Sequence, residues 1–307
     1  MSIGSTLTVS ILGCYAAAPG AFKNPTSQVL EIRNHLFLID CGEGTQVALR
    51  RNKIKFVRIK HIFISHLHGD HFFGLMGLIS TFSLLKRTAP LIIYGPVGLK
   101  EVILLQLKLT QSFTSYPLHF KELKSKEPQV VYEDDLVTVT TIPLKHRIYA
   151  NGYYFQEKEG FRKLDINAVL NLDIDKAYFN KIKQGGDVTL DDGTVVPNSE
   201  LTFDPPTPKS YAYCSDTTYK PAIADQIQHV TALYHESTFL ESHEHLCKPT
   251  GHSTAKQAAT IAKQANANNL ILGHYSTRYH DINEFKEEAQ TIFPHVHLAD
   301  DGEVFTF

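Results

Sequence analysis

The sequence predicts a layered α/β fold with one inserted segment. Short apolar, β-branched runs alternate with helical patterns along most of the 307 residues. One of these runs leads directly into a cluster of histidine and aspartate side chains, and one long polar stretch interrupts the alternation. A chain of this length forms one large domain or two small ones.

The expected strands are short and are followed by helices or hairpins. They lie near residues 7–12, 29–33, 36–40, 61–65, 91–94, 117–121, 136–142, 150–156, 210–214, 231–235, 269–273, 295–298 and 303–306. Helical patterns cover 43–51, 74–87, 97–110, 219–228, 254–265 and 282–291. The helix at 254–265 follows a hydroxyl N-cap, Ser253 or Thr254. This alternation predicts a layered α/β architecture.

The polar stretch at 156–208 is expected to be an excursion from that architecture. It carries the turn signals GGD and DDG, ends in DPPTPK and has no clear core pattern. A segment this long without a core is usually an arm, a lid or a disordered insert. Lys176, Lys181 and Lys183 cluster there with no acid between them, so the stretch is either a solvated loop or a functional arm.

The composition is that of an ordinary globular protein, with 43% hydrophobic and 20% charged residues. We expect no membrane span and no secretory signal, because no apolar run is long enough. The four cysteines form no CxxC pair, which favours reduced thiols and a cytoplasmic location. The net charge is −2, so a nucleic acid would have to be attracted by local basic patches. One candidate, residues 50–60, either contacts RNA phosphates or is a solvated connection.

The segment KHIFISHLHGDHFFGL, residues 60–75, is the strongest functional signal. In a loop that leaves a strand, alternate residues can point towards one centre. His66 and His68 can therefore bind one ion, while Asp70 and His71, displaced by a tight turn, face a second. Imidazole nitrogen and carboxylate oxygen are both zinc ligands. The alternative is a polar loop that happens to be rich in histidine.

Three further ligands are expected where other apolar strands meet their loops. His146 follows VTVTTIPLK, Asp216 follows YAYCS, and His274 follows NLILG. Open α/β sheets bind ligands at the carboxyl edge of their strands, so these residues should approach the 66–71 loop. A carboxylate can bridge two cations, which makes Asp216 the shared ligand. The predicted sets are His66, His68, His146 and Asp216 on one zinc ion, and Asp70, His71, His274 and Asp216 on the other.

Alternatives remain for single members of this set. His146 could be an ordinary loop histidine, and Asp216 could be a helix N-cap before Thr217. Cys214 alternates within its strand as a small buried side chain rather than a ligand. His/Asp sites accept Mn²⁺ as well as zinc. Two such ions can polarise a target oxygen and lower the pKa of a water. This suits phosphodiester hydrolysis, but also amide, thioester or sulfate-ester hydrolysis.

The motif HLHGDH, with its distant partners, resembles the metallo-β-lactamase superfamily. ILGCYAAAPG, LIDCGEGTQ, YGPVGL, YHESTF, GHST and ILGHYSTRY recur in order from about residue 7 to residue 300, and together they resemble the short-form tRNase Z family. The resemblance implies a single four-layer αββα domain over 1–307, a homodimer, and an extruded flexible arm at 156–208 that binds tRNA. It also implies cleavage of tRNA precursors after the discriminator nucleotide, leaving a 3′-hydroxyl on the tRNA and a 5′-phosphate on the trailer.

The resemblance implies catalytic roles as well. Asp70 would be the general base for the attacking water as well as a ligand. Glu236 would orient His252, which would protonate or stabilise the leaving 3′ oxygen; otherwise His252 is a loop histidine beside a helix cap. A carboxylate next to an imidazole fixes its tautomer and raises its basicity, which supports this pairing. Asp40 would support the histidine-rich loop.

The residues that contact the substrate follow less directly from the resemblance. Arg278 is either a phosphate contact or a surface arginine, and the three lysines of the arm would contact tRNA. Two departures from the family pattern stand out. PGAFKNP, at 19–25, lacks the arginine of the PxKxRN loop found in many relatives, and DIDKAYFNKIKQGG lacks the Gly-Pro of many arms. The resemblance therefore does not imply that this chain rejects CCA-bearing tRNA, nor how tightly its arm binds tRNA.

Two competing functions are considered. The same fold could act on a small phosphodiester or aryl ester. Alternatively, the chain could be a non-catalytic RNA-binding or assembly protein on an inherited metal scaffold. The complete ligand set, together with Glu236 and His252, argues against the second.

Overall fold

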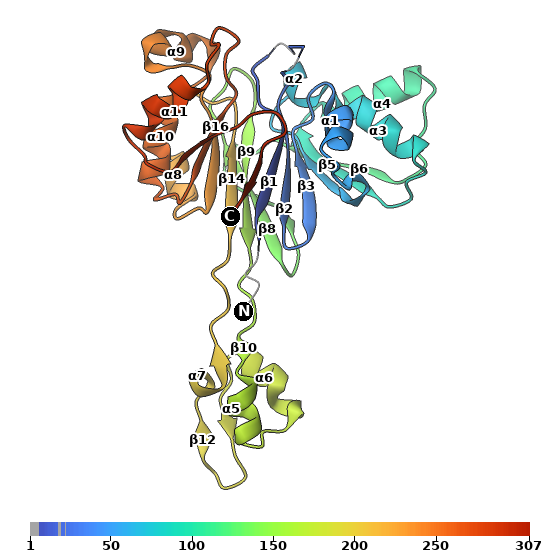
Figure 1. The fold of residues 1–307 in the computed structure, drawn as a ribbon. Helices are drawn as coiled ribbons and strands as arrows, with labels where there is room; N and C mark the ends of the chain where they lie inside the picture. The colour runs from blue at the N-terminus through green and yellow to red at the C-terminus, as the bar shows by residue number, and fades with distance from the viewer. Residues whose placement is uncertain (1–5, 18–19, 22) are drawn as a thin grey trace. The chain divides into compact units, whose positions relative to one another are not determined.

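The computed structural model describes residues 6–17, 20–21 and 23–307. The chain divides into a larger unit, Thr6–Gln156 with Lys209–Phe307, and a smaller unit that includes Glu157–Pro208. The larger unit contains two seven-stranded sheets, which lie face to face (Figure 1). Among the described residues, every helix is too short or too polar to cross a lipid bilayer.

The first sheet has the strand order β18-β1-β2-β3-β4-β5-β6. Its strands are β1 (Thr8–Gly13), β2 (Ser27–Ile32), β3 (His35–Ile39), β4 (His61–Phe63), β5 (Leu91–Pro96), β6 (Leu118–Leu123) and β18 (Val304–Thr306). β1, β2 and β3 pair antiparallel, whereas β3 to β6 are parallel. The carboxyl ends of β3 and β4 therefore meet at one edge, where Asp40 and the 66–71 loop begin.

The second sheet has the order β17-β16-β15-β14-β9-β8-β7. Its strands are β7 (Val130–Glu133), β8 (Val137–Pro143), β9 (Asn151–Glu157), β14 (Ser210–Cys214), β15 (Ala232–Glu236), β16 (Leu270–Gly273) and β17 (Val296–Leu298). β14 to β17 are parallel, and β14 is antiparallel to β9. Asp216, Glu236 and His274 thus end neighbouring parallel strands or directly follow them.

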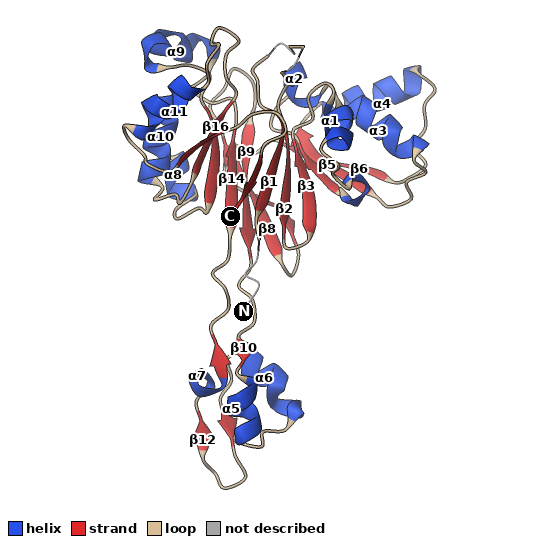
Figure 2. Ribbon diagram, in the orientation of Figure 1, coloured by secondary structure: helices blue, strands red, loops and turns tan. Residues whose placement is uncertain are grey.

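Helices cover the outer face of each sheet (Figure 2). The first sheet carries α1 (Thr45–Arg51), α3 (Leu75–Leu84) and α4 (Leu99–Leu109); the second carries α8 (Ile223–Gln226), α10 (Ala255–Gln264) and α11 (Asn283–Gln290). Between the sheets lies an aromatic core in which Phe63 contacts Phe37, Tyr153 and Phe155 edge-on. This is the predicted four-layer αββα sandwich.

Short helical segments complete the larger unit: η1 (Phe56–Arg58), α2 (Gly69–Phe72), η3 (Glu241–Leu246) and α9 (Cys247–Thr250). The predicted cap of α10 is confirmed at Thr254, whose Oγ1 accepts from the Gln257 backbone while the Gln257 side chain accepts from the Thr254 backbone. The helix expected over 219–228 is wrong in extent, because only Ile223–Gln226 is helical. Pro221 disfavours helical backbone at the residue before it, which delays the start.

The smaller unit is folded around a core of its own although its sequence shows no clear core pattern, so the alternative of a disordered insert is wrong. It contains β10 (Lys163–Leu164), α5 (Ile166–Asn171), η2 (Lys176–Tyr178), α6 (Phe179–Lys183), β11 (Val188–Thr189), β12 (Val195–Val196), α7 (Asn198–Leu201) and β13 (Thr202–Phe203). Its buried side chains are Leu164, Val169, Ile174, Ile182, Val188, Val196 and Leu201. The Asn198 amide donates to the Ile182 and Gly186 carbonyls. These apolar residues are too widely spaced to show a periodic pattern.

Candidate metal centre

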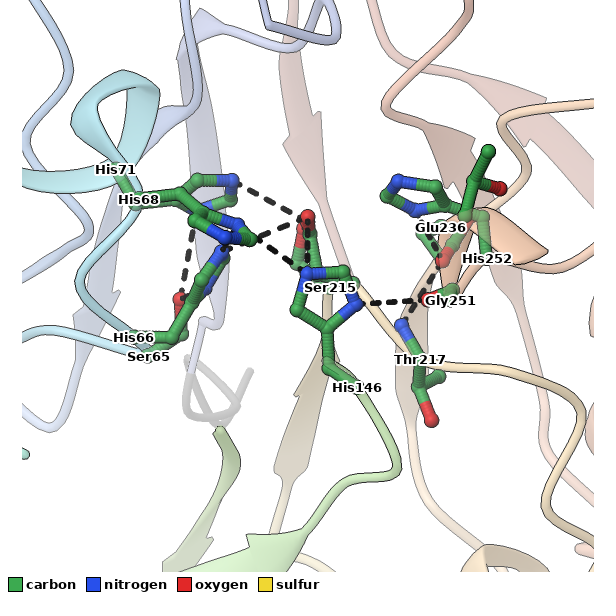
Figure 3. Close-up of polar contacts among 12 residues, drawn as sticks. Ser65, His66, His68, His71, His146, Ser215, Thr217, Glu236, Gly251 and His252 are labelled. Atoms are coloured by element: carbon green, nitrogen blue, oxygen red, sulfur yellow. Dashed lines mark hydrogen bonds and ion pairs between the residues drawn. The ribbon is translucent and has the colours of Figure 1, made fainter. Parts of the chain in front are cut away.

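The structure brings all seven predicted ligands together at the carboxyl edge of both sheets. His66 and His68 follow β4, and Asp70 and His71 lie in α2, while His146, Asp216 and His274 follow β8, β14 and β16. Their ligand atoms form two groups, each with members within 4.8 Å of one another. Figure 3 shows His66, His68 and His71 on one side and Glu236 with His252 on the other, with His146 and Ser215 between them.

The first group consists of His66, His68, His146 and Asp216. His68 Nδ1 lies 2.9 Å from His66 Nε2 and 3.2 Å from His146 Nε2. Asp216 Oδ2 lies 3.6 Å from His66 Nε2 and 3.7 Å from His146 Nε2. Four ligands placed tetrahedrally at zinc bond lengths are about 3.3 Å apart, so these separations suit one central ion.

The second group consists of Asp70, His71 and His274, and it faces the other oxygen of Asp216. Asp216 Oδ1 lies 3.2 Å from the Nε2 atoms of both His71 and His274. Asp70 Oδ2 lies 3.5 Å from His71 Nε2 and 3.8 Å from His274 Nε2. Each carboxylate oxygen of Asp216 therefore faces a different group, which is the arrangement a bridging ligand requires.

Two buried histidine nitrogens favour cations at these positions. The buried Nε2 atoms of His71 and His274 have no hydrogen-bond partner within the part of the chain that the structure describes. A buried polar nitrogen without a partner is costly. Cations would satisfy both nitrogens, and the ligand set of imidazoles and carboxylates matches metal chemistry. The residues present fit a pair of metal ions.

Asp40 lies beside this centre and contacts one of the proposed ligands. Its Oδ2 accepts hydrogen bonds from His71 Nδ1 at 2.8 Å, Ser65 Oγ at 2.8 Å and the Tyr213 hydroxyl at 2.6 Å; its Oδ1 accepts from the Ser65 backbone at 2.7 Å. With its proton held on Nδ1, His71 leaves Nε2 free to bind a metal.

Other ligand histidines have similar partners. His66 Nδ1 donates to Ser65 Oγ at 3.0 Å, His146 Nδ1 to the Gly251 carbonyl at 2.8 Å, and His274 Nδ1 to Thr238 Oγ1 at 3.0 Å. Sequence reasoning missed Ser65, Thr238 and Tyr213, because isolated hydroxyl residues carry no signal of such a role. Thr238 lies in the YHESTF motif, which was its only marker.

Backbone conformation also distinguishes three residues of the site. Asp40, Asp216 and His274 have φ values of 53°, 51° and 61°, in the left-handed region that non-glycine residues seldom occupy. Such strain clusters at functional sites. The alternative that Asp216 caps a helix is wrong, because residues 215–222 form no helix. Cys214 is buried in the core, as predicted.

Glu236 and His252 form a buried pair beside the centre. Glu236 Oε1 accepts from His252 Nδ1 at 3.0 Å and from the Thr217 backbone at 2.9 Å, and Oε2 accepts from Thr238. Burial lowers the pKa of His252, but the charge of Glu236 and its hydrogen bond outweigh this and raise the pKa to about 9. The His252 ring centroid lies 5.3 Å from that of His146 and 5.2 Å from that of His274.

The residues predicted to contact the substrate are exposed, unlike the buried and half-buried residues of the metal centre. Arg278 is exposed, and its guanidinium lies 5.3 Å from the Phe239 ring, which is itself 6.3 Å from the His252 ring. Lys176, Lys181 and Lys183 are exposed on η2 and α6 of the smaller unit. In the PGAFKNP loop, Pro19 and Phe22 lie outside the described residues, while the Lys23 ammonium lies 4.6 Å from the Tyr15 ring.

The chain is similar in sequence to proteins of known families. The family model described as anti-Pycsar protein Apyc1 matches residues 8–148. Ribonuclease Z of Bacteroides thetaiotaomicron is 46% identical over 289 residues, covering 94% of this chain and 92% of the relative. Ribonuclease Z of Porphyromonas gingivalis strain W83 is 45% identical over 289 residues, covering 94% and 95%.

Two solved structures have a similar fold. The short form of human tRNase Z superposes with a TM-score of 0.70 at 27% identity, covering 97% of this chain and 98% of the other. The metallo-β-lactamase fold protein YhfI of Bacillus subtilis superposes with a TM-score of 0.68 at 18% identity, covering 99% and 100%. The fold is therefore the metallo-β-lactamase sandwich.

Proposed function

The chain belongs to the ribonuclease Z family, and from this premise we propose that it is a dizinc endoribonuclease that removes the 3′ trailer from tRNA precursors. The observation that carries the metal assignment is the division of Asp216, whose two oxygens face two separate histidine groups. Zinc suits these imidazole and carboxylate ligands, and Mn²⁺ is the alternative. When bound, the two ions would supply charge stabilisation at the phosphate and lower the pKa of the attacking water.

Asp70 is proposed as the general base as well as a ligand. Its Oδ2 accepts a hydrogen bond from the Ala17 backbone at 3.0 Å and faces His71 and His274. These contacts hold the carboxylate at the second group, at the position from which it can take a proton from water. The other carboxylate oxygen is left for that proton transfer.

His252 is proposed to act on the leaving group. Water adds its oxygen to phosphorus, the bond from phosphorus to the 3′ oxygen breaks, and His252 delivers a proton to that oxygen. The products are a tRNA with a 3′-hydroxyl and a trailer with a 5′-phosphate. Glu236 keeps His252 oriented and charged through the hydrogen bond to Nδ1.

The smaller unit is proposed as the tRNA-binding arm. Its support is the cluster of exposed lysines on η2 and α6, which can contact phosphates of the tRNA backbone. We also propose a cytoplasmic homodimer. Its support is the group of exposed leucines on α3, α4 and the residue after α3, namely Leu84, Leu85, Leu104, Leu105 and Leu109, because exposed apolar patches mark interaction surfaces.

Cleavage of a 3′-extended tRNA precursor tests this proposal. The purified protein should cut next to the discriminator nucleotide, with the ends mapped at nucleotide resolution. His68→Ala should abolish cleavage while the circular dichroism spectrum persists, because His68 is a half-buried ligand outside the main cores. Cleavage by a preparation shown to be free of metal would refute the proposal.

Removing the smaller unit separates this proposal from hydrolysis of a small ester. Gln156 of β9 lies opposite Ser210 of β14 in an antiparallel pair, so an Asn-Gly turn can replace residues 157–209 and close a hairpin. Precursor cleavage should then fall strongly while hydrolysis of bis(p-nitrophenyl) phosphate continues. Unchanged precursor cleavage would show that this unit is not the tRNA-binding arm.

A further inference from the structure

Two adjoining basic pockets open beside His146, and the first of them also borders His252. We propose that they bind the tRNA strand on the 5′ side of the cleaved bond, with Arg147 and Lys248 contacting the first phosphate there. This inference rests on the proposed function. It states that the tRNA part of the precursor, and not the trailer, lies in these pockets.

The first pocket borders the metal centre directly. It has a volume of about 430 Å³, and its lining includes His146, His252, Arg147, Lys248 and Tyr219. The second pocket, of about 570 Å³, shares His146 and Lys145 with the first. The shared residues place the two hollows next to each other, on either side of His146 and Lys145.

The lining is strongly cationic in a chain whose net charge is only −2. The two pockets include the cations Lys126, Lys145, Arg147, Lys220 and Lys248, against a single acid, Glu244. Glu244 Oε1 accepts from the Gln257 side chain at 3.0 Å. Such a concentration of positive charge is an electrostatic footprint for a phosphate backbone.

Two of these cations are free to take a phosphate. Arg147 and Lys248 are exposed, and among the described residues neither has a carboxylate partner. Lys220, in contrast, donates to the Pro143 carbonyl at 2.6 Å. Its ammonium is therefore held in place and contributes positive charge to the pocket without reaching for a phosphate. Half-buried Tyr219 offers an aromatic surface in the same pocket, of the kind on which unpaired bases stack.

The direction of the strand follows from the position of His252. The group that protonates the leaving oxygen must lie within hydrogen-bond reach of it, and that oxygen belongs to the last nucleotide of the tRNA. The ribose of this nucleotide therefore lies against His252, on the flank opposite the 66–71 loop (Figure 3). Because His252 also lines the first pocket, the tRNA strand continues into it and the trailer leaves elsewhere.

The test neutralises single phosphates in a tRNA precursor. One substrate carries a methylphosphonate immediately 5′ of the cleaved phosphate, and another carries it immediately 3′. With the wild-type protein, the 5′ substitution should lower kcat/KM about tenfold, as expected for a charged hydrogen bond. In Arg147→Ala this substitution should cost less than in the wild type, because one of the two cationic contacts is already lost, while the effect of the 3′ substitution should be the same in both proteins.

Further measurements exclude a merely structural effect. Arg147→Lys should restore most of the 5′ penalty, because it restores the charge. The dependence of log KM on log salt should become shallower by about 0.7 for each lost contact in Arg147→Ala and Lys248→Ala. Lys263→Ala, an exposed lysine at the end of α10, is the matched control and should behave as the wild type does.

Two results would overturn the inference while leaving the proposed function intact. If Arg147→Ala removed the penalty of the 3′ substitution instead, the pocket would hold the trailer. If it removed neither penalty, the pocket would contact neither phosphate. Failure of the wild-type protein to cut the unmodified precursor is a different outcome, because it would refute the proposed function itself.

Discussion

Replacing Asp40 by asparagine is expected to weaken metal binding without unfolding the protein. Asp40 accepts four hydrogen bonds, three on Oδ2 and one on Oδ1. Asparagine has the same size but presents an NH₂ group where one oxygen was. If that group replaces Oδ1, the donor left without an acceptor is the Ser65 backbone N–H, at a cost of about 1–3 kcal/mol. A typical domain has about 5–15 kcal/mol of stability, so the fold should survive.

The larger effect of Asp40→Asn should be on the ions. His71 loses the charged partner that holds its proton on Nδ1 and its Nε2 free. Loss of such a partner lowers metal affinity about 10- to 100-fold, equivalent to about 1.4–2.8 kcal/mol. The assay is competition for zinc with a chromophoric chelator, with circular dichroism melts of the metal-free proteins alongside.

Two controls make this measurement decisive. Asp135→Asn removes an exposed carboxylate and should leave zinc affinity unchanged. Ser65→Ala removes one of the donors to Asp40, together with the acceptor for His66 Nδ1, and should give a smaller loss of affinity. Wild-type zinc affinity in a folded Asp40→Asn protein would refute the role assigned to Asp40.

Three further predictions address the centre and its chemistry. In Gly251→Ala, a Cβ would lie 2.7 Å from His146 Nδ1 at a residue with φ of 82°, so elemental analysis should find less metal per chain. Gly185→Ala, with φ of 92° and open space around it, has only the backbone strain and should keep its metal. His252→Asn should slow precursor cleavage about 10²- to 10⁴-fold but affect bis(p-nitrophenyl) phosphate far less, because p-nitrophenolate leaves without a proton; equal losses would contradict the role of His252. Chelation should lower the melting temperature by about 5–10 °C for each ion removed, since one ion at 100 times its Kd contributes about 2.7 kcal/mol, and an unchanged melting temperature would show that no ion stabilises the fold.

The strands and the convergence of the seven proposed ligands were predictable because each leaves a local pattern. β4 is a short apolar run that leads into His66, and the runs before His146, Asp216 and His274 have the same form. Parallel pairing then requires strand ends to meet at one edge. The division of Asp216 between two groups was also predictable. Seven ligands can give each of two ions four ligands only if one carboxylate is shared.

Other features depend on contacts between distant residues and left no local signal. The Tyr213 hydroxyl reaches Asp40 from the opposite sheet, and nothing around YAYCSD indicates this contact. The left-handed backbone at Asp40 and His274 is imposed by the surrounding structure. β7 was missed because its residues are half-exposed or exposed. In the smaller unit, Asn198 organises a core through carbonyls of residues far from it in sequence.

The origin of the ligands has a consequence for assembly. If Asp216 is counted in both groups, each group takes two proposed ligands from the half of the chain that builds the first sheet and two from the half that builds the second. Neither half alone presents more than two donors to an ion, so tight capture must wait until both halves have docked. The ions would then link the two halves of the chain at the carboxyl edge of both sheets. The time course of zinc uptake during refolding would report when the two halves dock.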